Sequence, residues 1–308
     1  MGEENLNQGE INALISLLDD TDEEIVAHVT SRLLSFGDKV LPVLEDRYLV
    51  ESETTLQARI HDIIDQIHQS GLHENLVTWA QNGGDDLFEG IYLVAKFRYP
   101  ELNKQSINNQ LDKIKLDAWL ELNFQVSAFD KVRILNYILF DLYNFKGNTD
   151  DYHAPDNSYI NRVLETRKGN PISLAIIYSI VAQRLNIPIF GVNLPQHFIL
   201  AYKDETQLKK HNSFKAPPFM NYNLPGEILF YINAFNKGAV FSRWNIDQFL
   251  KQLNIKSQGM YFEPCSNVDI IMRVCRNLIF SYEKTEDHQR IAALKDLLTL
   301  LQPYGSLH

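Results

Sequence analysis

The sequence has few cysteines and no long hydrophobic run. Among its 308 residues only Cys265 and Cys275 are cysteines, and they form no C-x-x-C pair. This excludes a disulfide framework and the usual zinc signatures. The longest apolar stretch, near residues 172–182, is far shorter than the ~20 residues that span a bilayer. No basic, apolar leader opens the sequence, so we expect a cytoplasmic protein that does not contact membranes.

Basic residues are also scarce. The chain has 29 Lys and Arg residues against 39 Asp and Glu residues, and its net charge is −10. Because an acidic surface repels phosphate backbones, we expect no nucleic-acid partner. Gly83-Gly84 is followed by Asp85-Asp86, whose charges would repel a nucleotide phosphate, so we expect no cofactor. The hydrophobic fraction of 45% excludes an intrinsically disordered chain.

Apolar residues at helical spacing dominate the first 70 residues. They predict three short amphipathic helices between residues 11 and 67. Asp22 precedes the second helix, where negative charge stabilises a helix N-terminus, and Gly37 follows its end. Residues 1–70 resemble HEAT-type repeat units, which bury one face by stacking on neighbours. An ordinary helical bundle accounts for the same pattern, and both interpretations stay open.

Residues 71–255 change from helical periodicity to strand-like alternation. Ser127 followed by Asp130 predicts a capped helix that Gly147 ends, and Ser158 predicts the cap of a short helix. The pattern then predicts a helix over residues 172–185, strands over 189–192, 197–202, 228–232 and 239–241, and an excursion from the sheet over 204–225. The predicted fold class is α+β, with a small antiparallel sheet packed on the 172–185 helix. Residues 256–308 have the periodicity of a helical hairpin and resemble one tetratricopeptide-type unit.

Several sequence blocks between residues 147 and 243 occur in a recognisable order. They are Gly147-Asn148, Asn157-Ser158-Tyr159-Ile160, Val163-Leu164-Glu165, Gly169-Asn170-Pro171-Ile172-Ser173-Leu174, Gly191-Val192-Asn193-Leu194-Pro195-Gln196-His197-Phe198 and Ile232-Asn233-Ala234-Phe235-Asn236-Lys237-Gly238. Together they resemble the SirB-type branch of the transglutaminase-like superfamily. The resemblance implies a papain-like site: a nucleophile at a helix start, a histidine on a following strand and an orienting residue on the next. By position these slots fall on Ser173, His197 and Asn233, where active relatives carry Cys, His and usually Asp.

The chemistry of these three residue types argues against efficient acyl transfer. A helix N-terminus stabilises a thiolate, but the hydroxyl of Ser173 requires a histidine base within ~2.6–3.2 Å. That base works best beside a carboxylate, and the aspartate-to-asparagine change in a serine protease lowers turnover about 10⁴-fold. Asn233 can orient an imidazole ring but brings no charge. We therefore expect little or no acyl-transfer activity.

Each candidate residue also has a purely structural interpretation. Ser173 can belong to a first helical turn, His197 can be a half-buried strand residue, and Asn233 suits a turn before Gly238. Four further polar residues have the chemistry of metal ligands, namely Asp150, Asp151, His153 and Asp156. Their spacing matches neither an EF-hand nor a zinc motif, and turn formation explains it, so we expect no metal site.

Three functions are compatible with this sequence. The leading hypothesis is a transglutaminase-like protein that binds a protein or peptide in the papain-type cleft with little or no acyl transfer. The second is a serine-dependent hydrolase or acyltransferase, in which Ser173 is the nucleophile, His197 the base and Asn233 the orienting residue. Backbone N–H groups near Ser173 would then form the oxyanion hole. The third is a structural adaptor that makes its contacts through the N-terminal helices.

Overall fold

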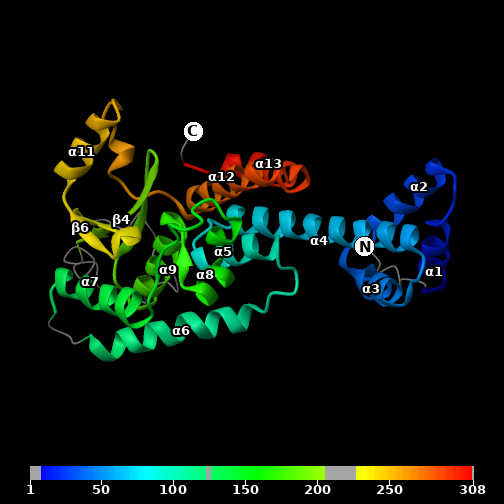
Figure 1. The fold of residues 1–308 in the computed structure, drawn as a ribbon, viewed down its shortest axis with the longest axis horizontal. Coiled ribbons are helices and arrows are strands. Elements are labelled where there is room, and N and C mark those ends of the chain that lie inside the picture. The colour runs from blue at the N-terminus through cyan, green and yellow to red at the C-terminus, as the bar shows by residue number, and fades with distance from the viewer. Residues whose placement is uncertain (1–7, 123–125, 205–226, 307–308) are drawn as a thin grey trace. The chain divides into compact units, whose positions relative to one another are not determined.

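Polar caps and apolar faces define the helices of the N-terminal unit, Met1–Asn75. The computed structural model describes residues 8–122, 126–204 and 227–306. In this unit it contains α1 (Gln8–Leu17), α2 (Glu23–Leu34), a 3₁₀ turn (Gly37–Val40), α3 (Leu41–Val50) and the first part of α4 (Thr54–Gln81) (Figure 1). As predicted, α2 follows Asp22, whose carboxylate accepts a hydrogen bond from the Glu24 N–H at 2.9 Å. One apolar core, which includes Leu33, Leu44 and Ile60, holds these helices together.

Helices also lead into the second unit, Leu76–His308. They are α5 (Leu87–Lys96), α6 (Lys104–Glu121), α7 (Ala128–Asn136) with a π-helical continuation (Tyr137–Leu142), a 3₁₀ turn (Pro155–Ser158), α8 (Ile160–Thr166) and α9 (Pro171–Arg184). The predicted cap of α7 is confirmed, because the Ser127 hydroxyl accepts from the Asp130 N–H at 3.2 Å. Gly147 does not end this helix. Asn144 adopts a φ of 57° before it, and Gly147 joins β1 (Lys146–Gly147), which pairs in parallel with β2 (Lys168–Gly169).

Ser158 does not cap α8 either. Its hydroxyl accepts a hydrogen bond from the side-chain amide of Asn170 at 2.8 Å, twelve residues further along the chain. Tyr159 is the N-cap residue of α8, and its side chain makes no capping hydrogen bond there. The local sequence predicted a cap at this point because a long-range partner for the serine is not visible in a short window.

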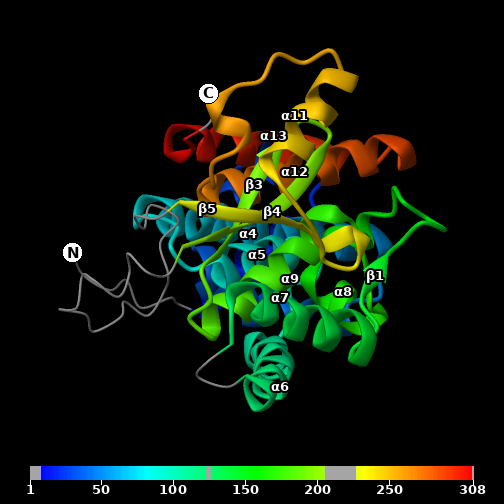
Figure 2. The same cartoon turned by 90° about the vertical axis from the view of Figure 1, so that its left-hand side faces the viewer.

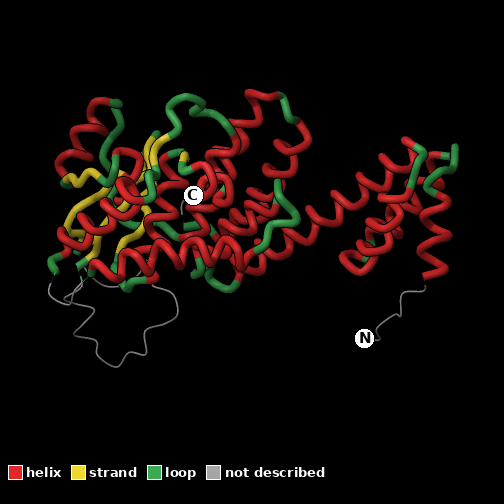
Figure 3. Tube along the Cα trace, turned by 60° about the horizontal axis from the view of Figure 1, so that its bottom comes forward, coloured by secondary structure: helices red, strands yellow, loops and turns green. Residues whose placement is uncertain are grey.

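An antiparallel sheet of four strands forms the centre of the second unit. The strands are β3 (Ile189–Leu194), β4 (His197–Lys203), β5 (Ile228–Asn233) and β6 (Ala239–Phe241), in the order β3-β4-β5-β6. They agree with the predicted strands to within two residues. The α+β prediction is confirmed, since helices form most of the described chain and the sheet is small (Figure 3). The predicted excursion over 204–225 lies, apart from residue 204, outside the described residues.

The two faces of this sheet carry different helices. Leu194 pairs with His197, and Leu194 packs in an apolar cluster with residues of α11 (Arg243–Gln252). Asn193 pairs with Phe198 and accepts a hydrogen bond from Arg273 of α12 (Asn267–Thr285). Because side chains alternate between faces along a strand, His197 lies on the α11 side and Phe198 on the α12 side. Figure 2 shows α9 running alongside the sheet, where it packs on β3 and β4.

The chain after the sheet forms the predicted helical hairpin. α12 packs against α13 (His288–Leu301), and a last 3₁₀ turn (Gln302–Tyr304) contains Pro303. Ser266 and Asp269 form a capping box at the start of α12. Within the described ranges, no helix combines the length and the apolar composition needed to cross a membrane.

A tight turn between β5 and β6 is coupled to helices α7 and α9 by hydrogen bonds. Gly238 has a φ of +70°, and an added Cβ would overlap the amide of Asn136. That amide donates to the Gly238 carbonyl at 2.9 Å and accepts from the Tyr178 hydroxyl of α9 at 3.0 Å. We expect Gly238→Ala to lower the free energy of unfolding by about 1–3 kcal/mol through backbone strain, with a further ~1–3 kcal/mol through overlap.

Gly83→Ala is the matched control for this substitution. Gly83 also has a positive φ, +96°, but the nearest atom to an added Cβ lies at 3.7 Å. Gly83→Ala should therefore lower the free energy of unfolding through backbone strain alone. Urea unfolding followed by tryptophan fluorescence measures the second unit selectively, because Trp79, Trp119 and Trp244 all lie in it. Equal losses for the two variants would contradict the proposed coupling.

Candidate functional site

The start of α9 is built by reciprocal hydrogen bonds between Asn170 and Ser173. The Asn170 side-chain oxygen accepts from the Ser173 N–H at 3.0 Å, and the Ser173 hydroxyl oxygen accepts from the Asn170 N–H at 3.0 Å. This is a capping box, and Pro171 occupies the first turn, where its missing N–H is no loss. Gly169 leaves room for the Ser173 side chain, since a Cβ at residue 169 would lie 2.6 Å from the Ser173 hydroxyl oxygen.

The hydroxyl of Ser173 is therefore committed to its own helix. It lies 3.2 Å from the Asn170 carbonyl, to which it donates, and the residue is only 3% exposed. No hydrogen bond joins Ser173 to His197 in the part of the chain that the structure describes. Both the donor and an acceptor position of this hydroxyl are occupied within the cap, which leaves it poorly placed to attack a substrate.

His197 opens β4, directly after the Pro195-Gln196 turn. Its ring meets the Phe249 ring of α11 edge-on, with centroids 4.8 Å apart. His197 is exposed to solvent at the strand end, but the groups packed around its ring partly desolvate it and lower its pKa below the ordinary value, and the positive charge of Arg273 lowers it further. Among the described residues no carboxylate pairs with this imidazole, so nothing stabilises the imidazolium that a general base must form.

Asn233 ends β5 and caps the turn that follows. Its side-chain oxygen accepts from the N–H groups of Phe235 at 3.1 Å and Asn236 at 3.2 Å. The strand register sets Ile232 opposite Leu200, so Asn233 and His197 lie at the same end of adjacent strands. No hydrogen bond joins them in the described ranges. The structure thus places these two candidates at the same end of the two inner strands, while Ser173 is held in the cap of α9.

A cavity of about 120 Å³ lies at the start of α9. Its walls are Asn170, Pro171 and Ile172 of α9, Gln196 and Phe198 of the β3–β4 hairpin, Arg273, Asn277, Phe280 and Ser281 of α12, and Tyr152 and His153 of the loop after β1. We call this the α9 cavity. His197 is absent from these walls, because Phe198 rather than His197 turns toward the α12 face of the sheet.

Aromatic side chains surround the α9 cavity. Tyr152 and Phe280 are each 47% exposed. The ring of His153 meets both of them edge-on, with centroids 5.2 Å apart in each pair. Exposed aromatic rings beside a cavity bind apolar and peptide groups well, because they bury a large area at a small loss of side-chain entropy.

Arg273 supplies the positive charge of the α9 cavity. It donates to the Leu194 carbonyl at 2.8 Å and to the side-chain oxygen of Asn193, both neutral acceptors. The guanidinium lies 5.8 Å from the centre of the Phe198 ring. Burial lowers the pKa of Arg273. The sequence interpretation missed this residue, although a lone arginine in the apolar run Ile270-Ile271-Met272-Arg273-Val274-Cys275 is a usable signal.

Neither cysteine of the chain offers a substitute nucleophile. Cys265 and Cys275 are both buried and free. Burial raises the pKa of each thiol to about 12. A thiol of such high pKa carries almost no thiolate near neutral pH and is chemically inert.

The acidic residues of the loop after β1 are engaged in ion pairs and turns. Asp150 pairs with Lys168 at 2.9 Å, which lowers the pKa of its carboxyl. Asp156 pairs with Arg162 at 2.9 Å and accepts from the Tyr99 hydroxyl at 2.9 Å. Within the described ranges, no three His, Cys, Asp or Glu side chains gather closely enough to hold a metal ion.

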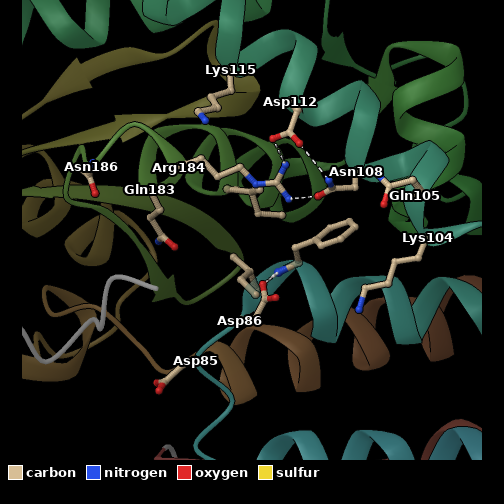
Figure 4. Close-up of a pocket in the computed structure, with 13 residues that line it drawn as sticks. Asp85, Asp86, Lys104, Gln105, Asn108, Asp112, Lys115, Gln183, Arg184 and Asn186 are labelled. Carbon is tan, nitrogen blue, oxygen red and sulfur yellow. Dashed lines mark hydrogen bonds and ion pairs between the residues drawn. The ribbon is translucent and has the colours of Figure 1, made fainter. Parts of the chain in front are cut away.

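A larger pocket of about 680 Å³ lies between α5, α6 and the end of α9. Figure 4 shows Arg184 held between Asp112 and Asn108, at 2.9 and 2.8 Å. Lys104, also labelled in Figure 4, pairs with Glu89. Arg184 and Lys104 thus each have a carboxylate partner, while Lys115 lines the same pocket without an ion pair among the described residues. We take the α9 cavity as the candidate site because it lies at the start of α9, beside the cap that contains Ser173.

Residues 105–276 match the family model described as the transglutaminase-like superfamily. A UPF0162 protein of Xylella fastidiosa is 30% identical over 216 residues, which are 68% of this chain and 70% of that protein. The UPF0162 protein YchA of Escherichia coli is 24% identical over 218 residues, 70% of this chain and 73% of that protein. F-box only protein 21 of Mus musculus is 40% identical over 83 residues, 27% of this chain and 13% of that protein. No solved structure matches the chain.

The surroundings of His197 determine the pH at which its imidazole takes up a proton. Because partial desolvation and Arg273 both disfavour the imidazolium, we expect the NMR titration midpoint of His197 to lie below the ordinary 6.5. Arg273→Gln should move the midpoint upward, but not fully to 6.5, since the partial desolvation remains. The unfolded chain binds this proton more readily, so the contribution of His197 to stability is lost as pH falls from 6.5 through the folded pKa.

Arg276→Gln is the control for that titration. Arg276 is exposed on α12, outside the α9 cavity, and has no resolved influence on His197. Its replacement should leave the midpoint unchanged. A His197 midpoint at or above 6.5 in the wild type would refute this description of the electrostatics.

Proposed function

The chain belongs to the transglutaminase-like superfamily and to the UPF0162 family, and from this membership we propose that it binds a protein or peptide at the α9 cavity with little or no acyl transfer. One observation carries the proposal. The hydroxyl in the nucleophile slot, Ser173, accepts from the Asn170 N–H and donates to the Asn170 carbonyl. The chain thus has the helix and strands of the superfamily, while the Ser173 hydroxyl is hydrogen-bonded within the cap of α9.

The alternative of a serine-dependent hydrolase has weaker support. It requires a Ser173 hydroxyl that donates to His197, and an orienting group on the other ring nitrogen. His197 instead packs against Phe249, and the Asn233 oxygen accepts two backbone N–H groups of its own turn. Three separate rearrangements would be needed to assemble the triad Ser173, His197 and Asn233.

The shape of the α9 cavity supports a peptide as the bound partner. About 120 Å³ accommodates one small side chain or chain end, but not a whole cofactor. The exposed rings of Tyr152 and Phe280 extend the surface outward from this cavity. A peptide that inserts one group and lies across the rings would use both features.

Finer assignments form part of the same proposal. We propose that the chain lies in the SirB-type branch, that residues 1–70 are HEAT-like and that α12 with α13 is tetratricopeptide-like. The shared apolar core of α1 to α4 and the antiparallel packing of the last two helices support these assignments. Two free, buried cysteines are consistent with a cytoplasmic location.

Substitution of the aromatic rim tests the binding proposal. Peptides selected from a phage-displayed random library on the full-length protein serve as probes, and fluorescence polarisation measures their Kd. We expect the double variant Tyr152→Ala, Phe280→Ala to raise the Kd of the selected peptides at least tenfold, because both rings lose their contact area. Trp119→Ala, which removes another exposed aromatic side chain (59% exposed) far along α6, should change the Kd less than twofold.

The adaptor alternative predicts that substitutions in the N-terminal unit, rather than at Tyr152 and Phe280, weaken peptide binding. The N-terminal unit exposes two adjacent apolar residues, Leu49 (80%) and Val50 (75%), at the end of α3. If the protein binds through this unit, Leu49→Ser with Val50→Ser weakens the selected peptides and the rim variant does not. That pattern would replace the proposed function with an adaptor function.

A further inference from the structure

Arg273 is a cation without a counter-ion among the residues that the structure describes. It lies on α12 between the buried residues Met272 and Val274, and its own side chain is half-buried. Its two acceptors, Leu194 and Asn193, are neutral and are both reached through the same guanidinium nitrogen, Nη1. In the described ranges no Asp or Glu oxygen lies within 4.0 Å of this side chain, whereas Arg184 has its carboxylate partner at 2.9 Å.

An unpaired charge at a half-buried position is unfavourable. Removing a charged group from water has a large desolvation penalty unless an opposite charge accompanies it. The lowered pKa of Arg273, caused chiefly by burial, reflects this penalty. An anion placed in the α9 cavity would offset it, so the site favours an anionic occupant over a neutral one.

The lining of the cavity narrows the chemical class of that anion. Arg273 is the one Lys or Arg side chain among its described lining residues, which matches a single negative charge better than a phosphate dianion. A guanidinium presents parallel N–H groups that match the two oxygens of a carboxylate. The volume of about 120 Å³ equals roughly four waters at ~30 Å³ each, enough for a carboxylate with its adjoining CH₂ groups.

We propose that the α9 cavity binds a carboxylate of the bound peptide, either the C-terminal carboxylate or an Asp or Glu side chain, through Arg273. This inference rests on the proposed function, which takes the occupant to be a peptide. The amide side chains of Gln196 and Asn277 line the same cavity and offer further N–H donors. Arg273 is here a binding residue and takes no part in bond making.

Three small probes test this inference on the full chain. N-acetylglycine presents a terminal carboxylate, N-acetylglutamate α-methylamide presents a side-chain carboxylate, and N-acetylglycinamide is the neutral counterpart. NMR chemical-shift titration should show at least one acid binding tenfold or more tightly than the neutral amide. Whichever acid binds better identifies the source of the carboxylate, and either result supports the proposal.

Variants of two arginines on the same helix locate the effect. Arg273→Gln should abolish the preference for the acid, whereas Arg276→Gln, an exposed control outside the cavity, should retain it. Arg273→Lys, which keeps the charge but loses the planar fork, should retain a reduced preference. If Arg273→Gln does not fold, the wild-type comparison and the Arg273→Lys variant still decide.

Equal affinity for acid and amide, or binding of none of the three probes, would overturn the inference. This outcome is distinct from failure of the proposed function. Peptides that bind through Tyr152 and Phe280 without any dependence on a carboxylate would reject the role of Arg273 alone. A carboxylate preference together with acyl transfer at Ser173 would uphold that role and reject the proposed absence of chemistry.

Discussion

The reciprocal hydrogen bonds between Asn170 and Ser173 are the constraint from which the site follows. They form the cap of α9, and they require a glycine at position 169 beside the hydroxyl. The side-chain amide of Asn170 also donates to the Ser158 hydroxyl. Asn170 also lines the α9 cavity, whereas Ser173 is not among its described walls. One of the two reciprocal bonds, together with the bond that the hydroxyl donates to the Asn170 carbonyl, occupies the hydroxyl that a serine enzyme would need to activate. In this chain, forming the helix and activating the nucleophile therefore compete for one side chain, and the structure favours the helix.

The alternation of side chains along β4 explains the rest of the arrangement. His197 pairs with Leu194 on the face that α11 covers, while Phe198 pairs with Asn193 on the face that α12 covers. Arg273 contributes positive charge to the α9 cavity, and His197 is not among its described walls. The walls include His153, but among the described residues neither Ser173 nor a carboxylate lines the cavity, so the groups that acyl transfer to serine requires are not assembled there. The superfamily fold is thus compatible with a cavity whose side chains can bind a ligand without acyl transfer.

Much of this fold could be predicted from local sequence, and the exceptions share a cause. The strands and α9 were predictable because alternation and the Gly169-Asn170-Pro171 sequence act over a few residues. Ser158 and Gly147 were misassigned because their partners, Asn170 and the strand of Gly169, are distant in the sequence. Likewise, the sequence shows that His197 and Phe198 point to opposite faces, but not which helix covers each face. Among the described residues Arg273 has no carboxylate partner, although Asp269 lies four residues earlier on α12, because the Asp269 carboxylate accepts hydrogen bonds from Ser266 in the helix cap.

The reactivity of the Ser173 hydroxyl tests the central claim most directly. The purified full-length protein is treated with a fluorophosphonate probe, and labelling is quantified by mass spectrometry at Ser173 and at the exposed Ser257. A hydroxyl held in the cap of α9 should be labelled no more than Ser257, and His197→Ala should change nothing. Stoichiometric labelling of Ser173 that disappears in His197→Ala would show an activated nucleophile and contradict the account.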